Sequence, residues 1–249
     1  MGFYRLSEEW IGFPDPTLAE NDGLLAIGGD LSMERLLLAY SNGIFPWYNP
    51  GEEILWWCPK RRFVIIPGEV HVSGSMRKWM KREVQSGHYQ VYINRDFEET
   101  IHQCRLLREE KEGTWITDEM EAAYCQLHER GYACSVEVYR VEEMEDSETA
   151  NTKETEMKKM QTKQTETLVG GLYGVSIGKC FFGESMFSKE KNVSKLALIA
   201  LSQVLKENAF LFIDCQFHTD HLESMGGKYI EWEEFDRMLQ EGIQGSRGR

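Results

Sequence analysis

A polar segment between two strand-like stretches constrains the fold more than any other feature of this chain. Residues 141–167 consist largely of Glu, Thr, Lys, Met and Gln, and they contain no aromatic residue, glycine or proline. Such a segment cannot bury enough apolar surface to offset the entropy of ordering it, so we expect disorder. Apolar and polar residues alternate at 133–139, and an apolar stretch returns at 168–175, which is typical of paired strands. The sequence therefore predicts a hairpin whose loop carries a long solvated insertion, rather than a functional tail.

The composition indicates a globular protein that stays where it is made. The chain has 249 residues, of which 41% are hydrophobic and 12% aromatic, enough for one large domain or a domain with a smaller partner. The longest wholly apolar run, at 196–201, is too short to span a bilayer. Acidic residues follow the N-terminus where a signal peptide would need an apolar stretch. We therefore expect a cytoplasmic protein with no membrane partner.

The net charge of −13 argues against indiscriminate nucleic-acid binding, which depends on neutralising phosphates with Lys and Arg. Any contact with nucleic acid must therefore be local. Basic residues do cluster, and we predict a one-sided patch that contacts phosphates, with solvated surface charge as the alternative. They are Lys60, Arg61, Arg62, Arg77, Lys78, Lys81 and Arg82, followed by Arg105 and Arg108.

The sequence offers no recognisable metal site or disulfide framework. The six cysteines form no Cys-x-x-Cys pair, so we expect reduced thiols rather than a zinc ribbon or a redox motif. His218 and His221 lack the further ligands of a known set, which favours structural histidines.

From residue 63 onward strand patterns mix with helix patterns, which indicates an α/β or α+β sheet domain. A small N-terminal domain is expected at 1–62, around a helix that begins after Asp30 or Ser32 and ends at Asn42-Gly43. The stretch 25–30 lacks the glycine spacings of known phosphate loops, so we interpret it as a tight turn. Further helices are predicted at 117–131, 192–207 and 232–240, and a strand at 209–214.

An apolar strand ends near Asp214 and Gln216, and strand ends are where open α/β sheets place ligands. This position favours a functional site. The alternative is that Asp214 caps a helix that begins near His218, with Gln216 merely exposed.

Glu184 is a single carboxylate among apolar and small residues, an environment that penalises an unpaired charge. It therefore requires a partner. A structural ion pair with Lys189 or Lys195 and a role in catalysis or cation binding are both compatible with the sequence.

Trp47 and Trp115 carry flat rings that can stack on a nucleic-acid base, a contact worth about 1 to 3 kcal/mol per base. The alternative is plain core packing.

Four motifs together resemble one enzyme family. They are GIFPWYNP with ILWWCPKRR at 43–62, EGTWIT at 112–117, GESMFS at 183–188 and IDCQ at 213–216. At these residues the chain resembles the leucyl/phenylalanyl-tRNA-protein transferases, bacterial enzymes that move an amino acid from tRNA onto a protein N-terminus. The resemblance implies a GNAT-like acyltransferase domain at 63–249, with a mixed sheet flanked by helices, after the small N-terminal domain.

The resemblance also implies roles for particular residues. Catalysis is expected from Asp214, Gln216 and Glu184, and tRNA contacts from the basic residues between Lys60 and Arg82 named above. Leu172, Leu201 and Leu205 replace the Met and Phe of related enzymes, which changes the shape of the side-chain pocket. The resemblance also implies a substrate-binding set, listed below. Without the resemblance, its aliphatic members would be interpreted as ordinary core residues. That set is Trp47, Trp115, Leu172, Ser188, Leu198, Leu201, Leu205 and Ile213.

The implied reaction is aminolysis of the ester of Leu-tRNA, Phe-tRNA or, less efficiently, Met-tRNA by proteins that begin with Arg or Lys. It marks them for degradation by the N-end rule pathway and needs no metal or nucleotide cofactor, because an ester is already activated. We expect Asp214, through or beside Gln216, to orient the amine and help take its proton. Glu184 would attract the acceptor's cation or hold the aminoacyl-adenosine.

Two other functions would require different sequence features. An acetyl-CoA-dependent acetyltransferase predicts an R/Q-x-x-G-x-G/A loop, and none precedes the helix at 192. A non-catalytic tRNA-binding protein would need the basic patch and the rings, but not the three polar site residues together.

Overall fold

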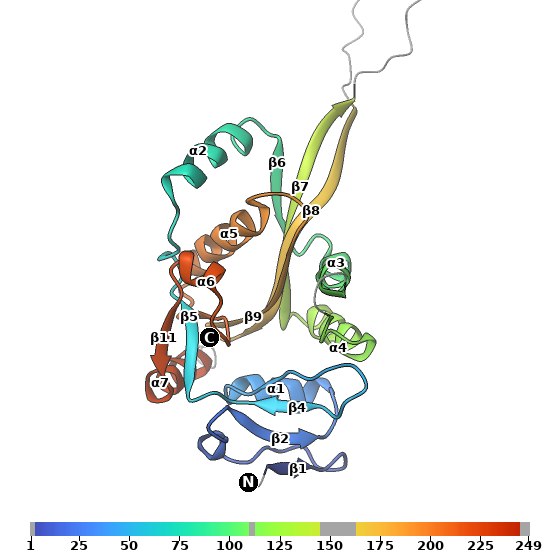
Figure 1. Cartoon of the computed structure of the whole chain (residues 1–249), viewed down its shortest axis with the longest axis vertical. Helices are drawn as coiled ribbons and strands as arrows, with labels where there is room; N and C mark the ends of the chain where they lie inside the picture. Colours follow the sequence, from blue (N-terminus) through green and yellow to red (C-terminus); the bar gives the residue numbers. More distant parts are fainter. Residues whose placement is uncertain (1–2, 110–112, 145–162, 245–249) are drawn as a thin grey trace, which may run out of the picture.

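The structure is a computed structural model that describes residues 3–109, 113–144 and 163–244. Two sheets with helices around them form an elongated molecule, with the small sheet at one end (Figure 1). Both sheets contain parallel and antiparallel pairs, which confirms the predicted mixed α/β class. The GNAT-like character of the larger part stays a prediction.

The small sheet belongs to the N-terminal part of the chain and has the strand order β1-β2-β4-β3. Helix α1 (Met33–Ser41) lies between this sheet and the rest of the molecule, where it contacts β8 and α4 (Figure 1). The strands of the small sheet are β1 (Tyr4–Leu6), β2 (Leu24–Gly28), β3 (Phe45–Pro46) and β4 (Leu55–Trp57). The short 3-10 helix η1 (Pro16–Leu18) lies between β1 and β2.

The larger sheet has seven strands in the order β11-β5-β10-β9-β8-β7-β6. Its neighbours are antiparallel except for β9 and β10, which run parallel. The expected domain boundary at 62/63 falls inside β5, so the division into 1–62 and 63–249 stays a prediction. The strands are β5 (Arg61–Ile65), β6 (Tyr89–Ile93), β7 (Ala133–Met144), β8 (Lys163–Ile177), β9 (Cys180–Ser188), β10 (Phe212–Asp214) and β11 (Lys228–Glu231).

Two apolar cores cover opposite faces of the larger sheet. Successive strand residues such as Phe212 and Ile213 belong to different cores, because side chains alternate between the two faces of a strand. Helix α5 packs on one face, and α3 and α4 on the other (Figure 1). The helices are α2 (Gly74–Glu83), α3 (Phe97–Glu109), α4 (Asp118–Glu129), α5 (Val193–Glu207), α6 (Asp220–Ser224) and α7 (Trp232–Gln244).

The predicted helices are confirmed, but the Ser32 side chain makes no capping hydrogen bond at the start of α1. Helix α1 starts after Ser32, and the Thr117 hydroxyl accepts a hydrogen bond from Met120 N at the start of α4. The last helix runs on to Gln244. The strand predicted at 209–214 begins later, since Ala209 adopts a left-handed φ of 55° that a strand cannot continue. Helices α2 and α3 were not predicted.

The predicted hairpin is confirmed, but its insertion is shorter than expected. Strands β7 and β8 pair as far as the ladder between Met144 and Lys163, so residues 141–144 and 163–167 are strand rather than loop. Residues 145–162, the rest of the predicted insertion, lie outside the described residues. The tight turn is also confirmed, with left-handed φ values of 78° and 76° at Gly28 and Gly29.

Among the described helices, none combines the length and the apolar character that a membrane crossing requires.

Substituting Gly174 by Ala is expected to destabilise the protein. A Cβ there would lie 2.2 Å from the Phe182 carbonyl oxygen and 2.6 Å from the Phe181 ring, so the backbone between β8 and β9 must shift. Overpacking of this kind costs about 1 to 3 kcal/mol in the free energy of unfolding, measurable in urea. Gly74→Ala is the matched control, because no atom lies within 4 Å of its added Cβ. Equal stability of both variants would contradict the packing argument.

Candidate active site

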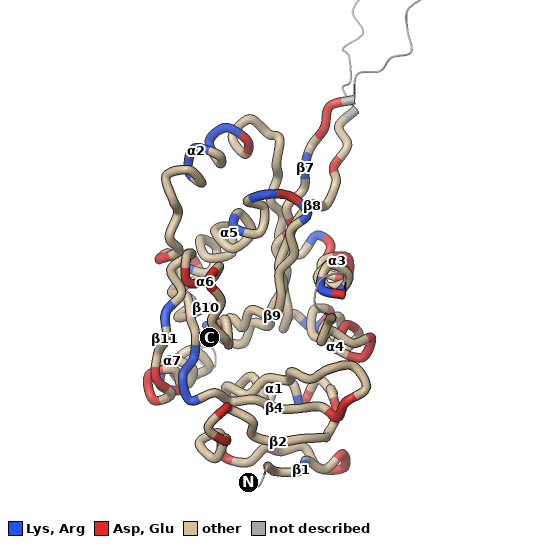
Figure 2. Tube along the Cα trace, in the orientation of Figure 1, with Lys and Arg blue, Asp and Glu red and all other residues tan. Residues whose placement is uncertain are grey.

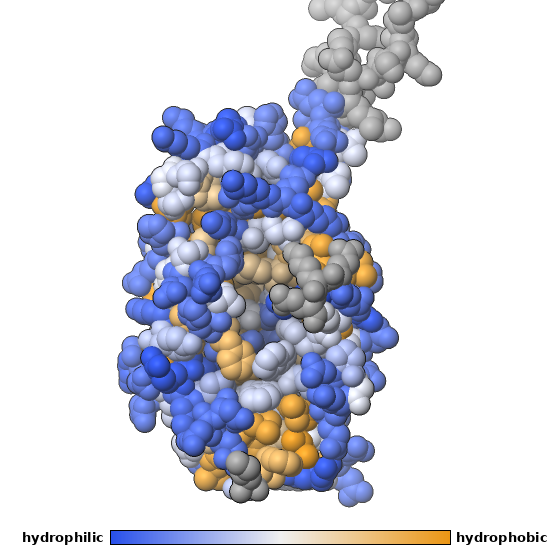
Figure 3. Space-filling model, in the orientation of Figure 1, coloured by the Kyte–Doolittle hydropathy of each residue, from blue (hydrophilic) through white to orange (hydrophobic). Residues whose placement is uncertain are grey.

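A cavity of about 500 Å³ opens where β9 and β10 part. The two strands pair only from Cys180 to Phe182, after which Gly183–Met186 line one side of the cavity and Cys215–Phe217 the other. The face of the molecule in Figure 3 is hollowed near its middle. The cavity therefore lies at the end of strand β10, where the sequence predicts a functional site near Gln216.

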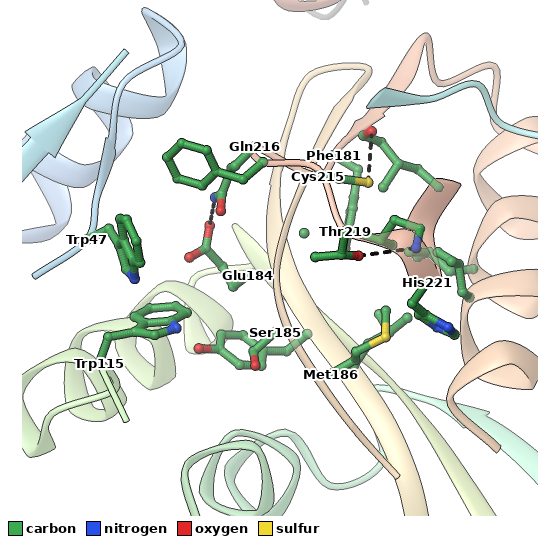
Figure 4. A pocket seen from close by; sticks show the side chains of 18 of the residues that line it. Trp47, Trp115, Phe181, Glu184, Ser185, Met186, Cys215, Gln216, Thr219 and His221 are labelled. Atoms are coloured by element: carbon green, nitrogen blue, oxygen red, sulfur yellow. Dashed lines mark hydrogen bonds between the residues drawn. The ribbon is translucent and has the colours of Figure 1, made fainter. Parts of the chain in front are cut away.

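The cavity has two ends of different character (Figure 4). Trp47 and Trp115 lie at one end, and Met186 and His221 at the other, with Glu184 and Gln216 between them. Trp47 follows β3 of the small sheet and is 42% exposed, so its ring can accept a stacking partner. The other end is walled by Leu172, Phe181, Leu198, Leu201 and Ile213.

A β-bulge on β9 aims Glu184 into this cavity. Tyr173 pairs with Ser185 and Gly174 with Gly183, so Glu184 is an extra residue without a partner on β8. The bulge reverses the alternation of side chains along β9. Phe181 and Phe187 would share a face in a regular strand, yet they belong to different cores.

Glu184 is buried among neutral hydrogen-bond donors. Its Oε1 accepts from Tyr40 Oη at 2.7 Å and from Gln216 Nε2 at 3.0 Å, and its Oε2 accepts from Tyr124 Oη at 3.0 Å. Desolvation raises the pKa of Glu184 to about 7, and the nearby Asp214 carboxylate acts in the same direction, whereas the three hydrogen bonds lower the pKa. Glu184 thus exchanges a proton near neutral pH.

Gln216 is held in a fixed position by a turn after β10. It adopts a left-handed φ of 63°, and its backbone N donates to Asp214 Oδ1 at 2.8 Å. A residue other than glycine persists in this conformation when its surroundings hold it there. The turn delivers the Gln216 amide to Glu184.

Asp214 itself is fully buried and forms an ion pair with Arg62 of β5. Arg62 Nε lies 3.2 Å from Asp214 Oδ1, its Nη2 also donates to Asp214, and its Nη1 donates to the Gly43 carbonyl at 2.6 Å. The guanidinium also lies over the rings of Phe45 and Phe235. The pair therefore joins the larger sheet to the segment that follows α1.

Most residues of the predicted substrate set meet at the cavity. Glu184 and Gln216 line it together with Trp47, Trp115, Leu172, Leu198, Leu201 and Ile213. Leu205 and Ser188 do not line it, which corrects the prediction for both. Leu205 is 5% exposed within the core, and the Ser188 hydroxyl donates to the Glu190 carbonyl.

The expected roles of Asp214 and Glu184 change in detail. Asp214 does not line the cavity, so it cannot take a proton from the substrate directly. It does not cap α6 either, since Thr219 makes that hydrogen bond. The partners of Glu184 are hydroxyls and an amide rather than Lys189 or Lys195.

The predicted basic patch is corrected at Arg62, which is fully buried with Asp214 and cannot reach a phosphate. The other members between Lys60 and Arg82 are exposed, although Arg61 pairs with Glu231 and Arg82 with Glu83, whereas Arg105 and Arg108 are half-buried. In Figure 2 the basic residues of α2 stand well apart from those at the start of β5. The structure therefore presents two basic surfaces rather than one patch.

Sequence reasoning missed the hydroxyls around Glu184. Tyr40 and Tyr124 are 84 residues apart in the chain, and their hydroxyls lie 2.5 Å from each other. Tyr40 lies within the first predicted helix and Tyr124 within the second, and nothing in the pattern of either segment predicted that their side chains meet. Tyr173, Phe217 and His221, which also line the cavity, were likewise not assigned to it.

Within the described parts of the chain, one group of side chains could hold a metal ion. The possible ligand atoms of His218, Asp220 and Glu223 lie within 4.8 Å of one another, but the two carboxylates are exposed. His218 also packs edge-on against Phe63, as a structural histidine would. All six cysteines are free.

Comparison with known proteins adds an independent observation. Residues 64–148 and 151–240 match the model of the leucyl/phenylalanyl-tRNA protein transferase family, and residues 29–60 match the model of its N-terminal domain. The chain belongs to this family. Its members are aminoacyltransferases, so the protein is an enzyme of that class.

Curated members of the transferase family are similar over nearly the whole chain. The leucyl/phenylalanyl-tRNA-protein transferase of Syntrophus aciditrophicus is 48% identical over 94% of this chain and 87% of its own length. Those of Desulforapulum autotrophicum and Pseudomonas entomophila are 46% and 45% identical, over 94% and 92% of this chain and 90% of their own lengths. The solved structure of L-PGS from Bacillus licheniformis is a distant neighbour, with 12% identity and a TM-score of 0.39 over 88% of this chain and 63% of its own.

Replacing Asp214 by Asn is expected to destabilise the transferase strongly. The substitution leaves the Arg62 guanidinium buried without an anionic partner, which costs about 3 to 5 kcal/mol in the free energy of unfolding. Arg61→Gln in the same strand is the control, because its pair with Glu231 is exposed and worth at most about 1 kcal/mol. Denaturant titration of the three proteins measures the difference, and an Asp214→Asn loss no larger than that of Arg61→Gln would refute the pairing.

Proposed function

We propose that this transferase moves Leu or Phe, and less efficiently Met, from aminoacyl-tRNA to the α-amine of proteins that begin with Arg or Lys. The observation that carries the proposal is the placement of Glu184. A carboxyl whose pKa is raised to about 7 lies between an apolar pocket and two indole rings, the exposed Trp47 and the half-buried Trp115. An acyl ester and an amine can meet there beside a base that works at neutral pH.

The donor fits the two ends of the cavity. The terminal adenine stacks at Trp47 and Trp115, and the side chain of the transferred Leu or Phe enters the apolar end beside Leu172, Leu198 and Leu201. Burying such a side chain stabilises binding by roughly 1.5 to 3 kcal/mol. The ester carbonyl then lies near Glu184 and Gln216, which stand between the two ends.

The reaction is aminolysis, with Glu184 as the base. An α-amine with a pKa of about 7.7 to 8.0 is largely protonated at neutral pH, so its ammonium gives a proton to the Glu184 carboxylate. The amine nitrogen then attacks the ester carbonyl carbon. The bond from that carbon to the ribose oxygen breaks, and the oxygen takes the proton back from Glu184. The nitrogen then gives its second proton to the freed Glu184 carboxylate, which passes it to solvent, so that an amide and a free tRNA end leave. Asp214 acts at a distance by holding Gln216, whose amide positions the carboxylate.

The tRNA body is proposed to contact the exposed basic residues, which attract phosphates locally in an otherwise acidic protein. This places tRNA across two surfaces, one at α2 and one at the start of β5 (Figure 2). The residues are Lys60, Arg61, Arg77, Lys78, Lys81 and Arg82.

The products would be proteins marked for degradation by the N-end rule pathway, in the cytoplasm. This part of the proposal rests on the family resemblance, as does the choice of Arg or Lys in the acceptor.

Purified protein mixed with labelled Phe-tRNA, Leu-tRNA or Met-tRNA is expected to extend peptides that begin with Arg or Lys. Product is measured by mass spectrometry, with Phe and Leu favoured over Met. Peptides that begin with Ala are the acceptor control and should stay unmodified. Tight tRNA binding without any peptide product would instead support a non-catalytic tRNA-binding protein, and transfer from acetyl-CoA would support an acetyltransferase.

A further inference from the structure

We propose that Arg108 and Tyr173 bind the phosphodiester that joins the terminal adenosine to the rest of the donor tRNA. The inference rests on the proposed function, because it takes the donor's adenine to stack at Trp47 and Trp115. It assigns a separate group of the donor, the phosphate next to that adenosine, to two side chains that line the same cavity.

Arg108 stands near the end of α3 and lines the cavity with a guanidinium that is already oriented. Its Nε donates to the Ser185 hydroxyl at 3.1 Å, which fixes the plane of the group and leaves both terminal nitrogens available. Among the described residues that line the cavity, Arg108 is the single arginine or lysine.

The charge of Arg108 has no carboxylate partner among residues 3–109, 113–144 and 163–244. Arg105, one turn earlier on α3, shows the contrast, since Glu109, Asp118 and Glu121 all pair with it. Two arginines of one helix thus differ: Arg105 is paired with carboxylates, whereas Arg108 lines the cavity without such a partner in the part of the chain that the structure describes.

Tyr173 supplies a second donor to the same cavity. Its side chain is fully buried, and its hydroxyl has no hydrogen-bond partner in the described structure. Burial raises the pKa of Tyr173 well above the usual value of 10.0, so the hydroxyl keeps its proton and can donate. A buried hydroxyl without a partner costs free energy, which a ligand oxygen would recover.

Among the chemical groups of the donor, a phosphodiester is the one that best matches Arg108 and Tyr173. It carries a permanent negative charge, which the planar guanidinium recognises through paired hydrogen bonds. The ester carbonyl is neutral in the ground state, and Glu184, the single carboxylate among the described lining residues, would repel a phosphate from the middle of the cavity. Repulsion by Glu184 and attraction by Arg108 therefore direct the phosphate to the Arg108 side.

Binding of adenosine 5′-monophosphate and of adenosine tests the proposal, with calorimetry of the full-length protein. The 5′-phosphate of the nucleotide stands in for the phosphodiester, so the wild type should bind it about tenfold more tightly than adenosine. Arg108→Gln should remove this advantage and leave the affinity for adenosine unchanged. Tyr173→Phe should reduce the advantage, and Arg105→Gln, the matched control of equal charge, should keep it.

Three results would overturn the inference. They are equal affinity of the wild type for the two ligands, an undiminished advantage in Arg108→Gln with a native melting curve, and an equal loss of the advantage in Arg105→Gln. Calorimetry measures ligand binding and needs no transfer reaction. Failure of the proposed function would appear in a different experiment, as absence of peptide product from wild-type protein and Phe-tRNA.

Discussion

The site depends on one constraint, the burial of a carboxylate whose hydrogen-bond partners among the described residues are all neutral. Glu184 is 7% exposed, and its partners are two phenols and an amide. A carboxylate in such a place keeps its proton more readily than in water, which is why its pKa is raised to about 7. A cationic partner would have cancelled this effect and left an acid with no tendency to exchange protons at neutral pH.

Segments from the whole length of the chain meet to maintain that constraint. Tyr40 comes from the helix beside the small sheet, Tyr124 from α4, and Gln216 from the turn after β10. The buried pair of Arg62 and Asp214 fixes the turn and at the same time holds the segment after α1 through Gly43. The contacts that hold the two sheets together therefore also position the site.

Local patterns predicted the fold class, the hairpin and the main helices, because caps and apolar spacing are properties of neighbouring residues. The motifs also led to Glu184, Gln216, Trp47 and Trp115, which the structure brings to one cavity. Arg62 could not be placed from sequence, because a cluster of basic residues looks the same whether its members are exposed or buried. Helices α2 and α3 and the phenols around Glu184 depend on tertiary packing, which no local spacing encodes.

The pH dependence of single-turnover transfer from Phe-tRNA to an Arg-initiated peptide tests the central claim most directly. The rate should fall below an inflection near pH 7, where the Glu184 carboxylate is protonated. Tyr40→Phe removes a donor that stabilises the carboxylate, so the pKa rises and the inflection must move to higher pH. Tyr92→Phe, whose hydroxyl bonds to Glu166 away from the cavity, should leave it in place. An inflection that stays unchanged in Tyr40→Phe would contradict the assignment of Glu184 as the base.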